Sequence, residues 1–304
     1  MSQEDGATYR SKTTETHRKV TAPGIQARKL SGEKIVALTA YDYPTGVLCE
    51  AAGMDLVLVG DSLGNTALGY ENTLPVTMDE MLAALRAVRR AVRRPLLVAD
   101  LPFGSYHVDP STTIDNAIRL LKSGAEAVKL EGGRRRAALV RQLVENETPV
   151  MAHIGLTPQS VHAMGGFKVQ GRSPAEARSL IDDALALEEA GAFSIVLEGV
   201  PVDLAATITE QLHIPTVGIG AGEGCGGQIL VLTDILGWLP GRKPKFVRQY
   251  ADLHSVAVDA LERYKIDVRR GEFPAARESY GSTLESSSEA ASRSKTHSSE
   301  PSSS

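Results

Sequence analysis

Short apolar runs recur from residue 35 onward, and most lead into an ionisable side chain, a glycine-containing loop and a segment with helical spacing. Aliphatic runs without polar alternation are typical of strands that are buried on both faces. Strands that alternate with helices indicate βαβ units and a parallel sheet. The pattern predicts eight strands, over residues 35–40, 55–59, 96–99, 125–130, 149–152, 194–197, 216–219 and 228–232.

Segments with helical spacing separate the predicted strands. One helix is expected to begin after Thr77, because Glu80 stands three residues on, as in a capping box. Ser173 and Glu176 form the same signature before a helix that should end at Gly191. Further helical segments are expected over residues 21–30, 44–52, 111–124, 134–145, 203–212 and 245–264.

The length of 304 residues fits one (β/α)8 TIM barrel, which needs about 250 residues, plus two tails. We therefore predict an α/β fold with a barrel domain over residues 21–270. Residues 1–20 are polar and of mixed charge, and we expect this N-terminal segment to be disordered. Residues 281–304 form a Ser-rich tail with too little apolar area to fold, so we expect disorder there too.

Composition restricts the class of partner. The net charge of −4 argues against nucleic acid, which usually requires a basic surface. Two cysteines, Cys49 and Cys225, are too few for a disulfide framework or a thiolate zinc site and fit a reducing compartment. The N-terminus lacks the apolar stretch of a secretory signal, and no apolar run is long enough to span a membrane. We therefore expect a cytoplasmic protein.

Ionisable side chains lie at the ends of five consecutive predicted strands: Asp61, Asp100, Glu131, His153 and Glu198. The carboxyl ends of barrel strands meet at one face, so these residues should share a pocket. Three carboxylates in one pocket repel one another without a cation, and oxygen ligands suit Mg²⁺. Asp61, Asp100 and Glu131 are therefore predicted to bind one metal ion. The competing interpretation for each carboxylate alone is a helix cap or a salt bridge.

Four polar residues have open alternatives. Glu198 is a candidate base for a proton on carbon, or the partner of a neighbouring Arg or Lys. Lys129 lies two residues before Glu131, so it could bind a substrate carboxylate or only neutralise Glu131. His153 could donate a proton or a hydrogen bond to substrate, or be structural. Ser62 could bind a substrate carboxylate or cap a helix.

Two further patterns have simple interpretations. Gly218, Gly220 and Gly222 alternate, but they lack the G-x-G-x-x-G form of a dinucleotide loop, so we expect backbone clearance near a ligand. The helix after Thr77 carries a basic run, which we expect to be a solvated face because the acidic total offsets it. The basic residues are Arg86, Arg89, Arg90, Arg93 and Arg94.

Eight strings spread over residues 21–264 are distinctive in combination: TAYD at 39–42, VGDSLG at 59–64, TLPVT at 73–77, ADLPF at 99–103, VKLEGG at 128–133, HIGLTPQS at 153–160, LEGVP at 197–201 and GIGAG at 218–222. Together they resemble the ketopantoate hydroxymethyltransferase (3-methyl-2-oxobutanoate hydroxymethyltransferase) family. The resemblance implies a barrel of the phosphoenolpyruvate/pyruvate type, one Mg²⁺ per subunit and a homo-oligomer, often a homodecamer.

The implied reaction is a one-carbon transfer. A hydroxymethyl group would pass from 5,10-methylenetetrahydrofolate to 3-methyl-2-oxobutanoate, giving 2-dehydropantoate for pantothenate biosynthesis through a metal-stabilised enolate. The resemblance implies the same three carboxylates as metal ligands and Glu198 as proton acceptor. The implied substrate-binding residues are Asp61, Ser62, Asp100, Lys129 and His153. The loops after the second and fifth predicted strands would close over the folate, but no residue there can be assigned to it.

Two rival functions remain at this level. The first is a related Mg²⁺ carbon–carbon lyase that acts on a substrate such as 2-methylisocitrate. That family places a reactive cysteine in a Lys-Lys-Cys-Gly string, which this sequence lacks. The second is a non-catalytic barrel that serves assembly or binding. Loss of metal ligands would mark that case, whereas all three candidate carboxylates are present.

Overall fold

The structure is a computed structural model that describes residues 18–241 and 243–281. Disorder was predicted for residues 1–20 and 281–304, and of these, residues 1–17 and 282–304 lie outside the described residues. At the described end of the first segment, Lys19 pairs with Glu126 and the Val20 amide donates to the Arg94 carbonyl oxygen at 2.9 Å. The chain divides into two compact units, one up to Ala251 and one from Asp252. We describe each unit by itself.

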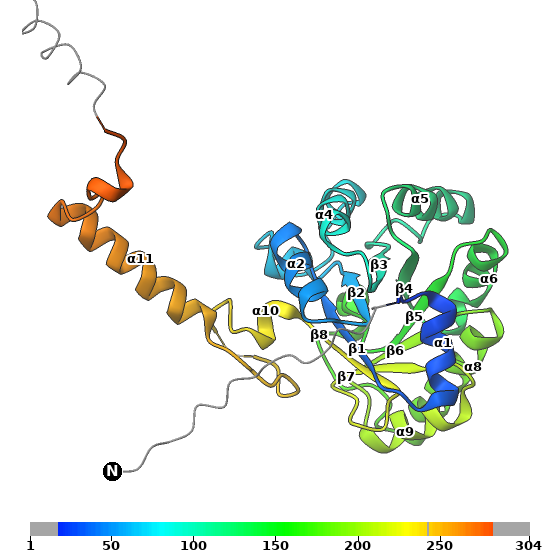
Figure 1. The fold of residues 1–304 in the computed structure, drawn as a ribbon. Coiled ribbons are helices and arrows are strands. Elements are labelled where there is room, and N and C mark those ends of the chain that lie inside the picture. Colours follow the sequence, from blue (N-terminus) through cyan, green and yellow to red (C-terminus); the bar gives the residue numbers. More distant parts are fainter. Residues whose placement is uncertain (1–17, 242, 282–304) are drawn as a thin grey trace, which may run out of the picture. The chain divides into compact units, whose positions relative to one another are not determined.

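The first unit is a closed barrel of eight parallel strands in sequence order, so the predicted (β/α)8 fold is confirmed (Figure 1). Each strand pairs with the next, and β1 closes the ring by pairing with β8, with Ile35 opposite Gly227. All eight predicted strands are present within a few residues of their predicted bounds. They are β1 (Ile35–Thr39), β2 (Leu56–Val59), β3 (Leu96–Asp100), β4 (Ala127–Glu131), β5 (Val150–Gly155), β6 (Ser194–Glu198), β7 (Thr216–Ile219) and β8 (Gly227–Leu230).

Longer helices cover the outside of the sheet. Both predicted capping boxes are formed, with Thr77 Oγ1 accepting from the Glu80 amide and Ser173 Oγ from the Glu176 amide, each at 3.2 Å. Because these side chains satisfy amides that the first helical turn leaves free, they define where α4 and α8 begin. The outer helices are α2 (Tyr43–Ala51), α4 (Met78–Ala91), α5 (Pro110–Lys122), α6 (Ala137–Glu145), α8 (Pro174–Glu189) and α9 (Val202–Gln211), whereas α1 (Ala22–Ser31) packs against the inner side chains of the barrel.

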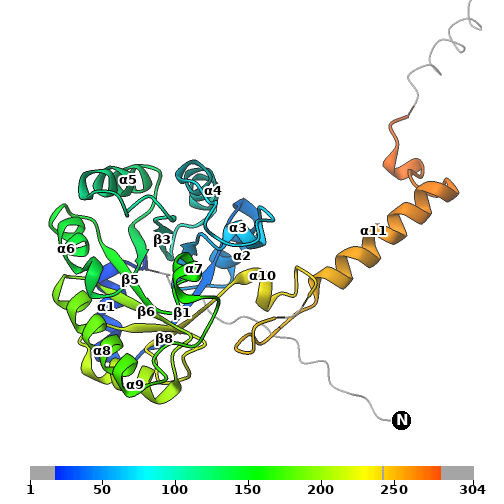
Figure 2. The same cartoon turned by 180° about the vertical axis from the view of Figure 1, so that it is seen from behind.

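Three short helices stand in segments that were predicted as loops or strand ends. They are α3 (Leu63–Thr66), α7 (Val161–Met164) and α10 (Leu232–Ile235). Four residues are about one helical turn, which is too short to show a helical period in the sequence. The segments that carry α3 and α7 follow β2 and β5, and both face the viewer in Figure 2.

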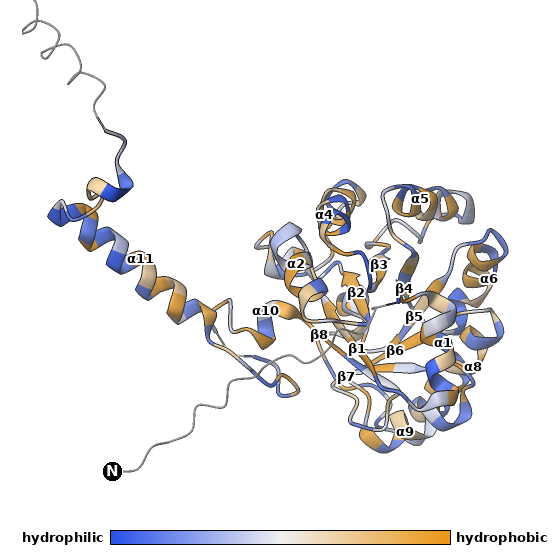
Figure 3. Ribbon diagram, viewed as in Figure 1, coloured by the Kyte–Doolittle hydropathy of each residue, from blue (hydrophilic) through white to orange (hydrophobic). Residues whose placement is uncertain are grey.

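The barrel contains two apolar layers. Outward-facing residues of the strands pack against apolar residues of the surrounding helices, and together they form the larger apolar cluster (Figure 3). Inward-facing residues such as Leu56, Val98 and Met151 fill the interior, and Ala22 and Ile25 of α1 belong to the same inner cluster. Because α1 and these side chains fill the interior near the amino ends of the strands, the open space for a ligand lies near their carboxyl ends.

The second unit contains the helix α11 (Leu253–Arg270), which was predicted at residues 245–264. It begins later because Asp252 accepts a hydrogen bond from the Ser255 amide as N-cap, and it ends at Gly271 in the left-handed conformation. No residue of α11 is buried. Among the described residues, no helix combines the length and apolar character needed to cross a membrane.

Candidate active site

A cavity of about 110 Å³ lies at the carboxyl ends of the strands. Its walls include every residue for which the sequence predicts a role in metal binding, substrate binding or catalysis. These are Asp61, Ser62, Asp100, Lys129, Glu131, His153 and Glu198. The barrel therefore brings the whole predicted set into one enclosure, as the strand-end pattern indicated.

Strand register determines which of these side chains are neighbours. Asp100 pairs in register with Lys129, and Glu131 pairs with His153. None of the three candidate carboxylates caps a helix, since α3 begins after Ser62 and α5 begins after Asp109. The interpretation as helix caps is therefore wrong for all three carboxylates, whereas the alternative of a salt bridge holds for Asp100, which pairs with Lys129.

Asp100 and Lys129 form a buried ion pair. Lys129 Nζ donates to Asp100 Oδ1 at 2.6 Å, and the Asp61 amide donates to Asp100 Oδ2 at 3.0 Å. Burial alone would lower the pKa of Lys129, but the charges of Asp100, Glu131 and Asp61 raise it overall. Lys129 therefore stays cationic, and its direct partner is Asp100 rather than the Glu131 that the sequence suggested.

Asp61 shows that the cavity has too little positive charge. Burial, followed by the charges of Asp100 and Glu131, raises its pKa to about 8, although Lys129 and Gln159 act in the opposite direction. A raised pKa means that the ionised form of the carboxylate is unfavourable, and a cation bound nearby would stabilise that form. The electrostatics of this side of the cavity therefore favour a bound cation.

His153 lies between two carboxylates. Its Nδ1 is 3.4 Å from Glu131 Oε1, and its Nε2 is 3.3 Å from Glu198 Oε2. The ring orientation does not give hydrogen-bond geometry to either oxygen. Burial lowers the pKa of His153, but the two carboxylates outweigh it and raise the pKa to about 9. The imidazole is therefore charged at neutral pH, and it is the ion-pair partner of Glu198 in place of the Arg or Lys considered from the sequence.

Ser62 faces a tyrosine that the sequence did not single out. Ser62 begins α3, but its side chain makes no capping hydrogen bond. Its Oγ instead lies 2.8 Å from Tyr41 Oη, at the end of β1. The capping role is thus not formed, and the hydroxyl is held at the cavity wall. Tyr41 stands in one of the distinctive strings, which was the only available signal for it.

Two uncharged residues behind the cavity were also missed. Gln159 lies in the 3₁₀ turn Pro158–Ser160 after β5, and its Nε2 donates to Asp61 Oδ2 at 2.8 Å. Tyr106 Oη donates to Gln159 Oε1 at 2.6 Å. Both residues are almost fully buried. Neither residue type marks a catalytic site by charge, so only the string that contains Gln159 pointed to this region.

The donor set fits a hard cation. Asp61, Asp100 and Glu131 present carboxylate oxygens, which are the ligands that Mg²⁺ prefers. Within the described residues, no three His, Cys, Asp or Glu side chains form a ready-made metal-binding group. The oxygens of Asp100 are engaged by Lys129 and the Asp61 amide in this arrangement. The fit therefore rests on donor chemistry and on the raised pKa of Asp61.

The alternating glycines near β7 serve packing within the protein. A Cβ on Gly220 would lie 2.8 Å from the Phe246 ring, and a Cβ on Gly222 would lie 2.7 Å from Val202. Both glycines also have positive φ, which disfavours other residues. The space that we expected near a ligand is filled by the chain's own side chains.

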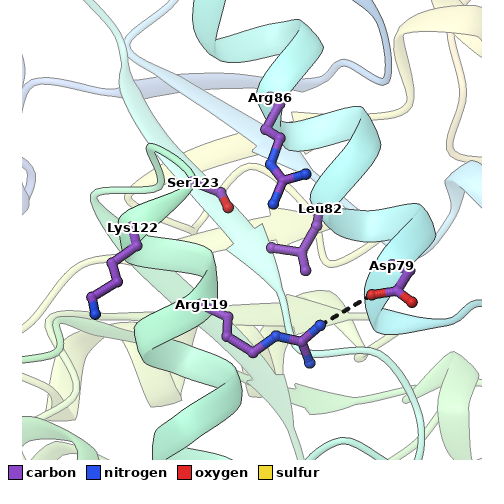
Figure 4. Close-up of a pocket in the computed structure, with 6 residues that line it drawn as sticks. All are labelled: Asp79, Leu82, Arg86, Arg119, Lys122 and Ser123. Atoms are coloured by element: carbon purple, nitrogen blue, oxygen red, sulfur yellow. Dashed lines mark hydrogen bonds and ion pairs between the residues drawn. The ribbon is translucent and has the colours of Figure 1, made fainter.

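A larger hollow of about 560 Å³ lies on the outer flank between α4 and α5 (Figure 4). Arg86, Arg119 and Lys122 line it, and Arg119 Nη2 pairs with Asp79 Oδ1 at 3.0 Å. It contains none of the predicted site residues. Of the basic run that was expected to form a solvated face, Arg86, Arg90 and Arg93 are exposed, whereas Arg89 and Arg94 are partly buried, so that prediction is confirmed only in part.

Comparison with known proteins identifies the family. The family model described as ketopantoate hydroxymethyltransferase matches residues 19–276, which is most of the chain. The chain belongs to the ketopantoate hydroxymethyltransferase family. It is therefore an enzyme of the hydroxymethyltransferase class, as predicted. This membership excludes the rival interpretations as a carbon–carbon lyase or a non-catalytic barrel.

Curated relatives agree with the family match. A protein of Geobacter metallireducens named 3-methyl-2-oxobutanoate hydroxymethyltransferase is 54% identical over 259 residues, covering 85% of this chain and 97% of that protein. A protein of the same name from Methylobacterium sp. is 56% identical over 260 residues, covering 86% of this chain and 90% of that protein. The similarity thus extends over nearly the full length of both relatives.

Solved structures share the fold of this chain. The chain is similar to 2,3-dimethylmalate lyase, described as a member of the PEP mutase/isocitrate lyase superfamily, with a TM-score of 0.54 and 16% identity. The similarity covers 90% of this chain and 99% of the lyase. It agrees with the (β/α)8 barrel and concerns the fold alone.

Proposed function

We propose that the chain transfers a hydroxymethyl group from 5,10-methylenetetrahydrofolate to 3-methyl-2-oxobutanoate, giving 2-dehydropantoate for pantothenate biosynthesis. The observation that carries the proposal is the single cavity that joins all seven predicted residues. The shared name of the curated relatives supports the choice of oxoacid. The folate co-substrate and Mg²⁺ are expected from the family resemblance.

The cavity has two chemically different sides, which fit a branched oxoacid. The ionisable side chains come from β2 to β6, whereas β7, β8 and the residue after β8 contribute Ile219, Ile229, Leu230 and Val231. The carboxylate and oxo group would face the polar side, and the isopropyl group would contact the apolar side. Small-molecule sites commonly combine an apolar wall with a few polar groups in this way.

Asp61, Asp100 and Glu131 would hold the Mg²⁺ ion. When bound, the ion would supply Lewis-acid stabilisation of the negative charge that develops on the oxo oxygen of the substrate. Ser62 and Lys129 would bind the substrate carboxylate, since one offers a hydroxyl and the other a fixed positive charge. Buried polar groups without a hydrogen-bond partner among the described residues, such as the Thr73 hydroxyl and the His153 nitrogens, are further candidates for ligand contact.

Glu198 would move the proton. Its carboxylate lines the cavity at the end of β6, and the charged His153 imidazole lies beside it, with Nε2 at 3.3 Å from Glu198 Oε2. Removal of the C3 proton by Glu198 would leave a carbon nucleophile, which attacks the methylene carbon carried by the folate. Water would supply the hydroxyl oxygen of the product, and tetrahydrofolate would leave.

The test is exchange of the C3 proton of 3-methyl-2-oxobutanoate in D₂O with Mg²⁺ and without folate, followed by NMR. The wild-type protein should catalyse the exchange, and Glu198→Gln should slow it by about 10²–10⁴-fold, as expected for loss of a general base. Glu210→Gln, an exposed change of the same chemistry, is the matched control. Absence of exchange with the wild-type protein would refute the proposed chemistry.

We also propose that the enzyme is a cytoplasmic homo-oligomer, with ten subunits as the family resemblance suggests. The exposed apolar residues of α11 support self-association, because Val256 and Leu261 are 64% and 66% exposed. Two free, buried cysteines are consistent with a reducing compartment. Light scattering coupled to size-exclusion chromatography would give the subunit number, and Leu261→Glu should reduce it. A monomeric wild-type protein would contradict the proposal.

A further inference from the structure

Gln159 connects four segments of the barrel at one buried point. It lies in the turn after β5, yet its side-chain amide reaches Asp61 after β2 and the carbonyl oxygen of Leu101 after β3. Its main-chain amide donates to Glu131 Oε2 of β4 at 3.0 Å. One residue therefore contacts two of the proposed metal-binding carboxylates without belonging to the proposed chemistry.

The orientation of the Gln159 amide is determined by its surroundings. Tyr106 Oη donates to Oε1 at 2.6 Å, while Nε2 donates to Asp61 Oδ2 at 2.8 Å and to the Leu101 carbonyl oxygen at 3.1 Å. A rotated amide would place its oxygen against two acceptors. The Glu131 amide donates to Tyr106 Oη at 3.3 Å, and the Arg136 guanidinium lies 5.0 Å from the centre of the Tyr106 ring. These contacts hold the tyrosine, which in turn holds the amide.

Each carboxylate is engaged by Gln159 through one oxygen. Asp61 receives the side-chain donor at Oδ2, and Glu131 receives the main-chain donor at Oε2. The second oxygen of each carboxylate receives no hydrogen bond from Gln159. Hydrogen bonds to charged groups are stronger than neutral ones and restrict rotation of the carboxylate. Partners behind a metal ligand commonly determine its orientation and affinity in this way.

We propose that Gln159 is a positioning residue that orients Asp61 and Glu131 for cation binding, with Tyr106 as the residue that orients Gln159. The inference rests on the proposed function only in taking these carboxylates as metal ligands. Gln159 does not touch the cation or the substrate in this scheme. It presents two carboxylates from different strands in a fixed arrangement before the cation arrives, which reduces the reorganisation that binding requires.

The test measures Mg²⁺ affinity of the protein without substrates, by isothermal titration calorimetry. Gln159→Glu keeps the size of the side chain but removes the donor to Asp61, and Gln142→Glu makes the same change at an exposed position of α6. We expect the Mg²⁺ dissociation constant of Gln159→Glu to be 10- to 100-fold higher than that of the wild-type protein, as is usual when a partner behind a metal ligand is lost. The dissociation constant of Gln142→Glu should be unchanged.

Tyr106→Phe is the second variant, in case Gln159→Glu does not fold. It keeps Gln159 and the ring packing but removes the hydroxyl that orients the amide. We expect weaker Mg²⁺ binding by several-fold and little change in circular dichroism. Wild-type affinity in both folded variants, or in Tyr106→Phe alone if the other is unfolded, overturns the role of Gln159. A wild-type protein that binds no Mg²⁺ instead overturns the proposed metal site, so the two failures are distinguishable.

Discussion

Replacement of Lys129 by Met tests whether the polar side of the cavity is held by a buried charge pair. Both partners are almost inaccessible, with side chains 6% and 2% exposed for Lys129 and Asp100. Met keeps most of the length of the side chain but removes the positive charge. Asp100 would then lie unpaired beside Asp61 and Glu131. The charge of Glu131 already raises the pKa of Asp100, and the charges of Asp100 and Glu131 raise the pKa of Asp61.

The expected loss of stability is large. Breaking a buried ion pair by removing one partner costs about 3–5 kcal/mol, because an uncompensated buried charge remains. For a barrel of this size each kcal/mol corresponds to roughly 2–4 °C, so the thermal midpoint should fall by about 6–20 °C. Asp100→Asn in the same chain removes the charge that was left unpaired. The double variant Lys129→Met/Asp100→Asn should therefore recover much of the loss.

Differential scanning calorimetry in EDTA gives the required midpoints for the wild-type protein, both single variants and the double variant. Lys122→Met, an exposed change on α5, controls for loss of a lysine at the surface. The reasoning is refuted if Lys129→Met lies within about 1 kcal/mol of the wild-type protein, well below the range for a broken buried pair. It is also refuted if the double variant is no more stable than Lys129→Met.

Three further perturbations have defined outcomes. In EDTA the thermal midpoint should fall as pH rises: the pKa of His153 is raised from 6.5 to about 9, so its stabilisation is complete below pH 6.5 and lost through pH 9. His153→Gln should flatten that melting profile. Gly155→Ala should destabilise the protein by about 1–3 kcal/mol in urea titrations, because φ is +92° and the new Cβ would lie 2.3 Å from the main-chain carbonyl oxygen of Glu198. Tyr41→Phe removes the hydrogen-bond partner of Ser62. In steady-state assays it should raise KM for the oxoacid about five-fold, which corresponds to the loss of one hydrogen bond. An unchanged KM would contradict the role of Ser62 in binding the substrate.

The site residues that could be predicted from the sequence are those at the ends of the apolar runs that form the strands. A buried aliphatic run that leads into Asp61, or ends on Asp100 or Glu131, is visible in the sequence, and barrel geometry brings such ends together. The alternation of side chains along a strand also placed Lys129 and Glu131 on the same side.

The pairing of charges could not be predicted in the same way. Lys129 is closest in sequence to Glu131, but it pairs with Asp100 because the register of β3 and β4 places them side by side. Gln159 and Tyr106 come from loops, have no charge and follow no period, so only the folded chain shows that they meet. The three short helices were missed because one turn leaves no repeating pattern.

The strands that supply the acidic residues are neighbours along the chain as well as around the ring. Their pairing closes short stretches of polypeptide, whereas β1 and β8 meet across nearly the whole domain, the closure with the greatest entropic cost. We expect the carboxylates to assemble first with water still among them. Sealing of the last strands would then dehydrate Asp61, so the final step of folding should be accompanied by uptake of a proton or a cation.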